Sequence, residues 1–318
     1  MSVFDASAAF KDGVPAGRPD ADPKQNPTAA AVLARAALRS LRLSRKLKQA
    51  AVAAGTNMSA SKLCKIETGH AIMQAGDAES LADFYNLPPA QKAWLVTLGQ
   101  QASNPPTWQQ AGLVAPPSME QLVGLEPAAV RLWTYEADLI SGLLQTEAYM
   151  RAVMASSQPP LRADEIEERV KLRLYRQAKV FADPPDCIFL FDESMLLRRI
   201  GSWETMVGQF DHLIGVAGNP RIQIRIVPLD GMQVLSGVCS MTLLDFGMGS
   251  TGLPSVIYLE VGDRGRYFVK GIGGPVEPEE GAPSFDRHST TLTMLLGHAA
   301  GRDESLEILK AARQRFLR

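Results

Sequence analysis

The feature that most constrains the fold of this chain is residues 47–69, with the sequence LKQAAVAAGTNMSASKLCKIETG. It predicts two short helices, of which the first runs from about Lys48 to Ala54. Gly55-Thr56-Asn57 then breaks the helix, because glycine and asparagine tolerate the positive φ that a sharp corner needs. Ser59 stands where the next helix needs an N-cap oxygen. The segment therefore predicts two helices joined by a tight turn.

The second helix of this pair separates apolar from polar residues. Leu63 and Ile66 fall three apart on one face, whereas Ser61, Lys62 and Lys65 project from other faces. Two helices that cross at a turn, the second offering short polar and basic side chains, match what the major groove of B-DNA accepts.

Positive charge is concentrated in the same region, although the formal net charge is only −1. Between Thr28 and His70 the sequence has one carboxylate, Glu67. The cations of this stretch are Arg35, Arg39, Arg42, Arg45, Lys46, Lys48, Lys62 and Lys65. A basic helix face is often only solvated. Charge of nearly one sign beside the predicted turn instead favours a surface that binds nucleic-acid phosphates in a salt-dependent way.

Residues 28–102 predict a compact all-α domain of five short helices. The first begins near Ala29 and has an apolar stripe along one side. The stripe consists of Leu33, Ala37, Leu38 and Leu41, and the arginines expected outside it are Arg35, Arg39 and Arg42. Leu81, Phe84 and Tyr85, on a helix that begins at Asp77, are expected to close a small core.

Two segments without regular periodicity flank this domain. Residues 1–27 are rich in proline and glycine and predict a flexible leader, whose four aspartates argue against a DNA-contacting arm. Residues 103–118 are rich in proline and predict a semi-stiff linker rather than a folded element. The second domain is then expected to span residues 119–318.

The second domain begins with predicted helices and continues with strands. Helices are expected around residues 126–137, 142–157 and 163–182, the last with Ile166, Val170, Leu172 and Leu174 pointing inward. Short β-branched or alternating runs at residues 187–191, 222–229, 239–246, 255–261 and 266–272 are typical of strands. Further helices are expected at about residues 193–199, 203–217, 285–298 and 303–316. This pattern predicts an α+β domain with a mostly antiparallel sheet.

The composition argues against secretion, metal binding and membrane insertion. Cys64, Cys187 and Cys239 are widely spaced, with no CxxC pair and no nearby histidine to complete a zinc site. No N-terminal apolar run resembles a signal peptide, and no apolar run reaches about 18 residues. A reducing cytoplasm is therefore the expected location, with no membrane partner.

Signals of enzymatic or ligand chemistry are weak. Residues 247–252 form a GxGxxG pattern, but a predicted strand follows instead of the helix that a dinucleotide site needs, which favours a loop. The four histidines lack triad spacing. Asp192-Glu193 is more typical of a helix cap than of an acid/base pair. We expect no catalytic, metal or cofactor site.

One cluster in the second domain has two interpretations. Arg173, Arg176 and Gln177 lie at i, i+3, i+4 spacing on a predicted helix. They are suited either to an anionic ligand or to salt bridges with the acidic residues of the domain, and the salt-bridge interpretation is favoured.

Residues 38–69, LRSLRLSRKLKQAAVAAGTNMSASKLCKIETG, resemble the lambda-repressor-like or Xre-type helix-turn-helix position for position. The runs LVGLEPAA, TYEADLISGLLQTEAYMRAV, IEERVKLRLYRQ, FDESMLLRRIGS and RIQIRIVPLDG resemble the large C-terminal domain of actinobacterial regulators described as antitoxin-like. Together the two resemblances cover about residues 31–315. Two departures stand out: Thr56-Asn57 where leucine and glycine are usual, and Ser141 where the PGLLQ pattern has proline.

The resemblance implies roles for individual residues. Gln49 matches a glutamine that braces its helix on the phosphate backbone, next to the cation Lys48. Ser59, Ser61 and Lys62 match positions that reach base edges, and Lys65 matches a basic position near phosphate. Glu67 and Gly69 match a structural helix end and are left out of the contact set.

The sequence therefore predicts a sequence-specific transcription regulator that binds double-stranded operator DNA. We expect a homodimer on an inverted repeat with half-sites about 10 to 10.5 bp apart. The second domain would sense a small-molecule effector or a small protein partner, or dimerise. Two alternatives stay open: an antitoxin-like partner-binding protein with autoregulatory DNA binding, and an enzyme or small-molecule-binding protein with a vestigial helix-turn-helix.

Overall fold

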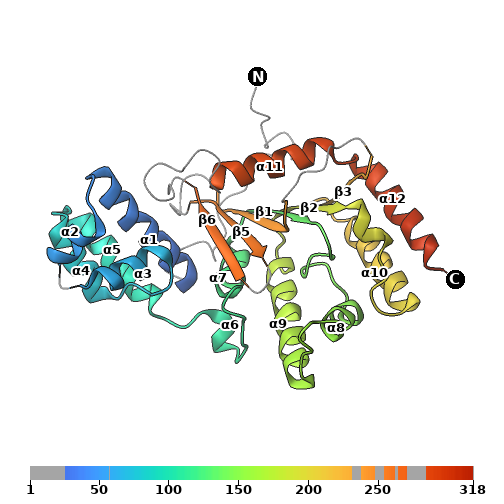
Figure 1. The fold of residues 1–318 in the computed structure, drawn as a ribbon, viewed down its shortest axis with the longest axis horizontal. Helices are drawn as coiled ribbons and strands as arrows, with labels where there is room; N and C mark the ends of the chain where they lie inside the picture. Colours follow the sequence, from blue (N-terminus) through green and yellow to red (C-terminus); the bar gives the residue numbers. More distant parts are fainter. Residues whose placement is uncertain are drawn as a thin grey trace.

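The computed structural model describes residues 26–56, 58–230, 238–247, 254–261, 264–270 and 284–317. A helical N-terminal region lies at one end of an α+β domain, as predicted (Figure 1). The predicted leader up to residue 25, Asn57 and residues 248–252 of the GxGxxG pattern lie outside the described residues. Among the residues described, no helix is both long and apolar enough to cross a bilayer.

The described N-terminal region contains the five predicted helices. They are α1 (Pro27–Ser44), α2 (Gln49–Ala54), α3 (Ala60–Thr68), α4 (Ala75–Phe84) and α5 (Pro89–Ala102). The side chain of Asn26 caps α1 by accepting from the amide of Ala29 at 3.0 Å. The helices share an apolar core in which Leu38, Leu63 and Leu81 are almost fully buried.

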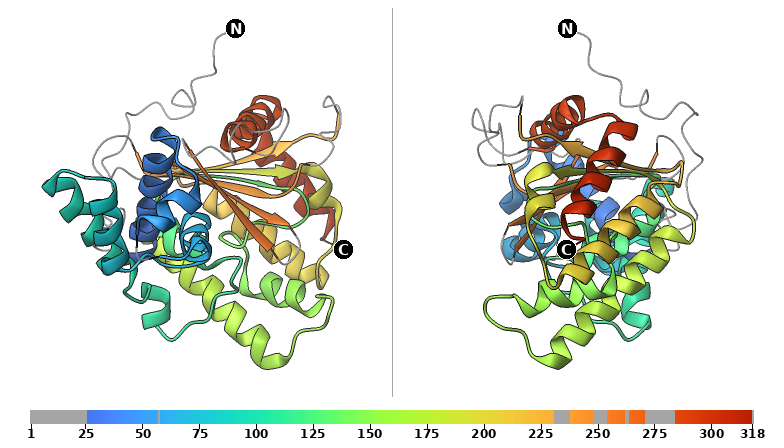
Figure 2. Two further views of the ribbon diagram at one scale, coloured as in Figure 1. Left: turned by 60° about the vertical axis from the view of Figure 1, so that its left-hand side comes forward. Right: turned by 90° about the vertical axis from the view of Figure 1, so that its right-hand side faces the viewer.

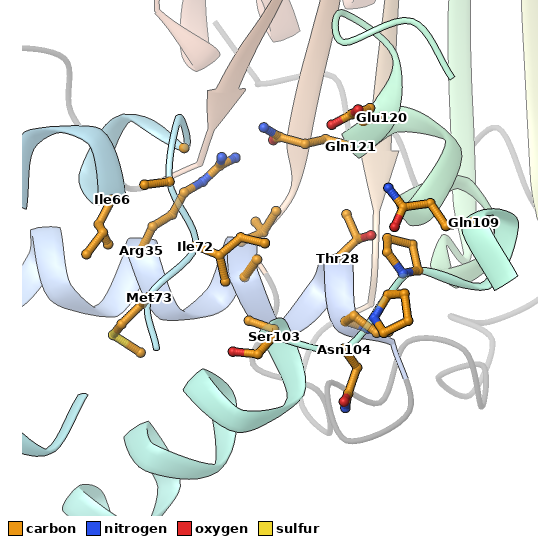
Figure 3. Close-up of a pocket in the computed structure, with 18 of the residues that line it drawn as sticks. Thr28, Arg35, Ile66, Ile72, Met73, Ser103, Asn104, Gln109, Glu120 and Gln121 are labelled. Atoms are coloured by element: carbon orange, nitrogen blue, oxygen red, sulfur yellow. The ribbon is translucent and has the colours of Figure 1, made fainter. Parts of the chain in front are cut away.

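The prediction that the arginines of α1 lie outside its apolar stripe is wrong for two of them. Arg35 and Arg42 are buried, at 9% and 8% exposure. Arg42 pairs with a carboxylate on α3, and Arg35 extends toward Gln121 of α7 (Glu120–Leu125), a helix of the second domain (Figure 3). The groups that bury both side chains are distant in the sequence, so the periodicity of α1 did not reveal them.

The predicted linker is partly folded. Within residues 103–118 the chain forms α6 (Thr107–Gln110), and Trp108 is buried against Val123 and Leu172 of the second domain. The hydroxyl of Tyr267 donates to the carbonyl of Ser118 at 2.8 Å and accepts from the amide of Leu122 at 3.1 Å. The expectation of a join without folded elements is therefore wrong at α6, because apolar partners from later elements cover it.

A six-stranded sheet in the order β3-β2-β1-β4-β5-β6 forms the centre of the second domain. The strands are β1 (Arg131–Glu136), β2 (Asp186–Asp192), β3 (Ile222–Val227), β4 (Met241–Asp245), β5 (Val256–Val261) and β6 (Arg264–Val269). The pairs β1/β2 and β2/β3 are parallel, and the other three pairs are antiparallel. The predicted mostly antiparallel sheet is confirmed.

Helices cover both faces of the sheet (Figure 2). Beside α7 the remaining helical elements are η3 (Glu126–Ala128), α8 (Glu147–Ala155), α9 (Ala163–Phe181), η4 (Glu193–Leu197), α10 (Trp203–Val216), α11 (Phe285–His298) and α12 (Arg302–Arg315). Along β2, Ile188 and Leu190 pack on the side of α11, whereas Phe189 and Phe191 join the core with α10 and α12. Successive side chains of a strand point to opposite faces, so this strand is buried on both.

The predicted helix at residues 126–137 is wrong. After the short η3 the chain forms β1, which pairs with β2 on one side and β4 on the other. Leu132 packs on one face of the sheet, and Trp133 and Tyr135 pack on the other. Burial between two neighbouring strands overrides the local helix signal of the EPAA run.

The predicted inward face of α9 is correct only in part. Val170 and Leu172 are buried and Ile166 is partly buried, but Leu174 is 39% exposed. Val170 and Ile166 pack in a cluster with methionines of α8, of which Leu174 is not a member.

Candidate nucleic-acid interface

The turn between α2 and α3 satisfies its own polar groups. The hydroxyl of Thr56 donates to the carbonyl of Val52 at 2.9 Å, so the departure from leucine at this position has a hydrogen-bond partner. Ser59 is the N-cap of α3 and accepts from the amide of Lys62 at 3.1 Å, as predicted. The start of α3 is therefore fixed by local contacts.

The two faces of α3 are those that the sequence predicted. Leu63 and Ile66 are each 1% exposed and pack in the core of the N-terminal region. Ser59, Ser61 and Lys65 are exposed. At the C-terminal end Gly69 adopts φ of 81°, the left-handed conformation that ends many helices and that favours glycine.

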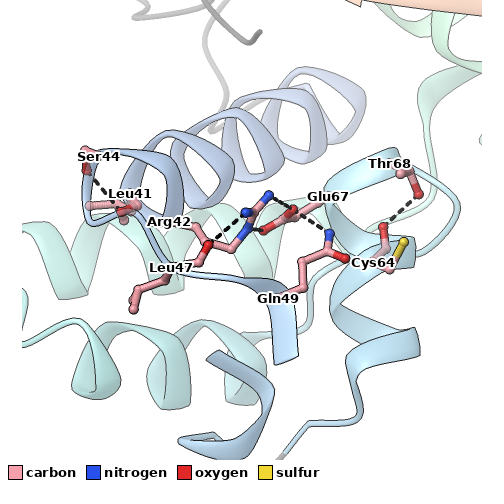
Figure 4. Close-up of polar contacts among 8 residues, drawn as sticks. All are labelled: Leu41, Arg42, Ser44, Leu47, Gln49, Cys64, Glu67 and Thr68. Atoms are coloured by element: carbon pink, nitrogen blue, oxygen red, sulfur yellow. Dashed lines mark hydrogen bonds and ion pairs between the residues drawn. The ribbon is translucent and has the colours of Figure 1, made fainter. Parts of the chain in front are cut away.

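A buried ion pair ties α1, α2 and α3 together (Figure 4). The guanidinium of Arg42 donates through Nε and Nη2 to the two carboxylate oxygens of Glu67, both at 2.7 Å, and through Nη1 to the carbonyl of Leu47 at 3.1 Å. The Glu67 side chain is 1% exposed. Its hydrogen bond with Arg42 raises the pKa of that guanidinium. Glu67 thus has an architectural position.

Gln49 belongs to the same network. Its Nε2 donates to Oε2 of Glu67 at 2.8 Å, which occupies one of the two amide N–H groups. The side chain is half-buried at the first residue of α2, directly after the exposed Lys48. The structure therefore fixes Gln49 against α3 through its hydrogen bond with Glu67, and the exposed Lys48 directly precedes it.

Lys62 has a partner that sequence reasoning missed. Its Nζ lies 2.6 Å from Oδ1 of Asp77, and Oδ2 of Asp77 accepts from the amide of Gln74 at the start of α4. The Lys62 side chain is 45% exposed, so the pair lies at the surface. The position of Asp77 in the first turn of α4 indicates a carboxylate that caps this helix, but it does not identify Lys62 as a partner.

Other cations of the predicted basic region differ in how freely they face solvent. Lys48 and Lys65 are exposed and, among the described residues, form no ion pair. The guanidinium of Arg45 lies 4.7 Å from the centre of the Tyr85 ring. Since Arg35 and Arg42 are buried, the cationic surface is smaller than the eight residues of the sequence suggested.

Comparison with protein families matches both parts of the chain. A model described as a helix-turn-helix domain matches residues 34–95, which contain α2, the turn and α3. A model described as a domain of unknown function, DUF5753, matches residues 119–311, more than half of the chain. The chain belongs to the DUF5753 family. Comparison with curated proteins and with solved structures gave no match.

Three of the titratable groups that the sequence singled out in the DUF5753 domain have structural partners, whereas Nη1 of Arg173 is buried and has no hydrogen bond among the described residues. Asp192 caps η4 by accepting from the amide of Ser194 at 2.9 Å, and Glu193 accepts from the amide of Leu229 at 2.9 Å. Arg176 forms a buried two-point pair with Glu126, at 2.7 and 2.8 Å. The cap interpretation is confirmed for Asp192 and the salt-bridge interpretation for Arg176, while Gln177 donates to the carbonyls of Gly142 and Gln145 instead.

Two further observations bear on ligand chemistry in the DUF5753 domain. The next described element after Gly247 is β5, the strand that the sequence predicts there, and residues 248–253 between them are not described. The described residues contain no group of three or more histidine, cysteine or carboxylate side chains placed to hold a metal ion.

Proposed function

We propose that the protein is a sequence-specific, Xre-type transcription regulator whose helix-turn-helix domain reads operator DNA under the control of the DUF5753 domain. The observation that carries the proposal is α3, which presents exposed polar and basic residues on a helix-turn-helix frame fixed by the Arg42–Glu67 pair. The proposal that the protein is an actinobacterial, antitoxin-like regulator rests on the sequence resemblance, and a cytoplasmic location follows from the DNA target.

The contacts follow from the position of each side chain. Ser59 and Ser61 lie at the exposed N-terminal end of α3, the part of a recognition helix that reaches base edges. Lys65, Lys48 and the remaining N–H of Gln49 would contact phosphate. Lys62 must break its ion pair with Asp77 before it can contact a base. Base contact at this position therefore replaces the carboxylate of Asp77 with a polar atom of the base.

A single helix-turn-helix offers few base contacts, so we propose that two chains bind an inverted repeat. The expected half-site separation is one helical turn, about 10 to 10.5 bp. Footprinting on a bound operator would measure this spacing, and sedimentation would give the number of chains per operator.

The test of DNA binding is fluorescence anisotropy with labelled fragments of the DNA upstream of the protein's own coding sequence. We expect one fragment to bind in preference to a scrambled fragment, with an affinity that falls steeply as salt increases. Absent binding, or binding that salt does not change, would contradict the proposal.

The antitoxin-like alternative predicts a small partner protein encoded nearby. Purification of the tagged chain from its native cells, at salt high enough to remove DNA, separates this alternative from a solitary regulator. A stoichiometric small protein would favour the alternative. For the DUF5753 domain we propose a non-catalytic role, which is supported by the structural hydrogen bonds of Asp192, at the cap of η4, and of Glu193, with the amide of Leu229.

A further inference from the structure

A cavity of about 350 Å³ lies at the junction of the helix-turn-helix and DUF5753 domains (Figure 3). Its walls come from α1, the C-terminal end of α3 with the following loop, the end of α5, α6 and α7. This volume is in the range of small-molecule sites, which occur preferentially where domains meet.

Arg35 is the buried cation of this cavity. It lines the wall from α1, and among the described residues it has no hydrogen bond or ion pair. Burial lowers the pKa of its guanidinium to about 10, so the group keeps its charge at neutral pH. A buried charge without a partner is strongly unfavourable, which makes an anion the missing component.

Gly69 leaves the space that the Arg35 guanidinium occupies. A Cβ atom at this position would lie 2.1 Å from Nη1 of Arg35. The same glycine ends α3 with a positive φ. The end of the proposed recognition helix and the charged group of the cavity are therefore in direct contact.

Two lining residues also carry polar atoms that have no hydrogen bond among the described residues. They are the Oε1 of Gln121 and the Nε1 of Trp108, and neither atom is accessible to solvent. Figure 3 shows Arg35 and Gln121 extending toward each other from opposite walls. Buried polar groups in native proteins nearly always have partners, so the guanidinium of Arg35, buried at the cavity without a partner among the described residues, indicates a polar ligand.

The other residues that line the cavity indicate which class of anion would bind there. Val32, Ile66, Ile72 and Met73 give the cavity an apolar wall. Arg35 is the one cation among its lining residues, and the carboxylate of Glu120 is exposed. One cation balances a monoanion, whereas a phosphate dianion would leave an uncompensated charge.

We propose that this cavity binds a small monocarboxylate with an apolar body, whose carboxylate pairs with Arg35, and that its occupancy changes the DNA affinity of α3. The regulatory half of this proposal rests on the proposed DNA binding. The ligand contacts α1, the end of α3 and α7 together, so it favours one arrangement of the two domains over others.

The first experiment measures binding without DNA. Thermal-shift and calorimetric titrations of the full chain would use benzoate, phenylacetate and octanoate as probes, with benzamide and inorganic phosphate as controls. We expect at least one carboxylate to bind and raise the melting temperature, and neither control to do so. Failure of all three carboxylates, or equal binding of phosphate, would overturn the proposal.

The variant Arg35→Met tests the role of the guanidinium. We expect it to abolish carboxylate binding while the free protein is at least as stable as wild type, because an unpaired buried charge is removed. Arg39→Met, on the same helix but outside the cavity, is the matched control and should bind normally. Unchanged binding by Arg35→Met would overturn the proposal. Should that variant fail to fold, Ile72→Trp, at a half-exposed lining residue, should block the cavity and abolish binding.

The second experiment measures DNA affinity with and without saturating carboxylate. We expect a change of about fivefold or more in wild type and none in Arg35→Met. Equal affinity in wild type would overturn the regulatory half, while the titrations above would still report on the site. Absence of all DNA binding would instead contradict the proposed function.

Discussion

At the scale of single residues, the Arg42–Glu67 pair shows how charge is used inside the N-terminal region. A buried ion pair contributes little net stability compared with apolar residues of the same size, but removal of one partner leaves the other buried and unpaired. Glu67 also accepts from Gln49, so one carboxylate connects three helices.

We expect Glu67→Ala to lower the free energy of unfolding by about 3 to 5 kcal/mol, because Arg42 would lose its counter-charge in a buried site. Urea unfolding followed by circular dichroism would measure the loss. Glu79→Ala, at an exposed residue of α4, is the control and should change stability by less than about 0.5 kcal/mol. A similar loss in both variants would contradict the structural role of Glu67.

Lys62 and Lys65 should differ in their effect on DNA binding. Lys65→Ala should weaken binding to all sequences alike and reduce the salt slope by about 1, because it removes one phosphate contact. Lys62→Ala should change the preference among bases. Anisotropy with a panel of operator variants would measure both, with Lys171→Ala, at an exposed residue of α9, as control. Identical effects of the first two variants would refute the distinction.

Asp77 competes with DNA for Lys62. Asp77→Asn keeps an acceptor for the amide of Gln74 but removes the negative charge 2.6 Å from Nζ of Lys62. We expect operator affinity to rise by up to about fivefold, equivalent to about 1 kcal/mol for an exposed pair. The gain should disappear in the double variant with Lys62→Ala, and a gain that persists there would point to general charge repulsion instead.

At the scale of secondary-structure elements, α1 and α7 pack directly against each other at the junction of the two domains. Asn26 donates to the carbonyl of Gly124 at 2.8 Å, and a Cβ atom on Gly124 would lie 2.1 Å from the hydroxyl oxygen of Thr28. The apolar core continues across this contact, because Leu122 and Leu125 share a cluster with the residues of α1. Glycine is therefore needed at position 124 for the two helices to approach.

We expect Gly124→Ala to lower the free energy of unfolding by about 1 to 3 kcal/mol, because the added methyl group overpacks the contact between α1 and α7. Calorimetry should show a broader or split transition as the two domains become less coupled. Gly76→Ala is the matched control, because nothing lies within 4 Å of its Cβ position in α4, and it should be neutral or stabilising. Destabilisation by both variants would indicate a general effect of alanine.

At the scale of the whole molecule, one half-buried carboxyl group connects stability to pH. Removal of Glu136 from water, at the end of the central strand β1, raises the pKa of its carboxyl group to about 8. The charge of Glu260 adds to the rise, and hydrogen bonds with Ser240 and Ser141 oppose it. Ser141, which departs from the proline of the family pattern, thus has a polar partner.

The sign of the pH dependence follows from proton binding. Between pH 4.5, the ordinary pKa of a glutamate, and about 8, the folded protein holds a proton at Glu136 that the unfolded chain has released. Stability should therefore be highest below about pH 4.5 as far as this group is concerned, and should fall as pH rises through 8. Glu136→Gln should flatten the dependence of melting temperature on pH between 5 and 9. The exposed Glu168→Gln should leave it unchanged.

The sequence by itself determined the features that depend on near neighbours. The cap at Ser59, the apolar pair Leu63 and Ile66, and the turn after α2 are local, because capping and helical periodicity involve residues three or four apart. The later strands were also predicted from short alternating or β-branched runs, whereas β1 was mistaken for a helix because its two flanking strands come later in the chain.

Only the tertiary structure decided which charged groups face solvent. Arg42 and Lys62 are both cations on helices of the N-terminal region, yet one pairs with Glu67 in the core and the other with Asp77 at the surface. Arg35 became the buried cation of a cavity because α7, which begins 85 residues further along at Glu120, packs beside it. Burial and pairing of a charge depend on what packs against it in space, and helical periodicity carries no information about that partner.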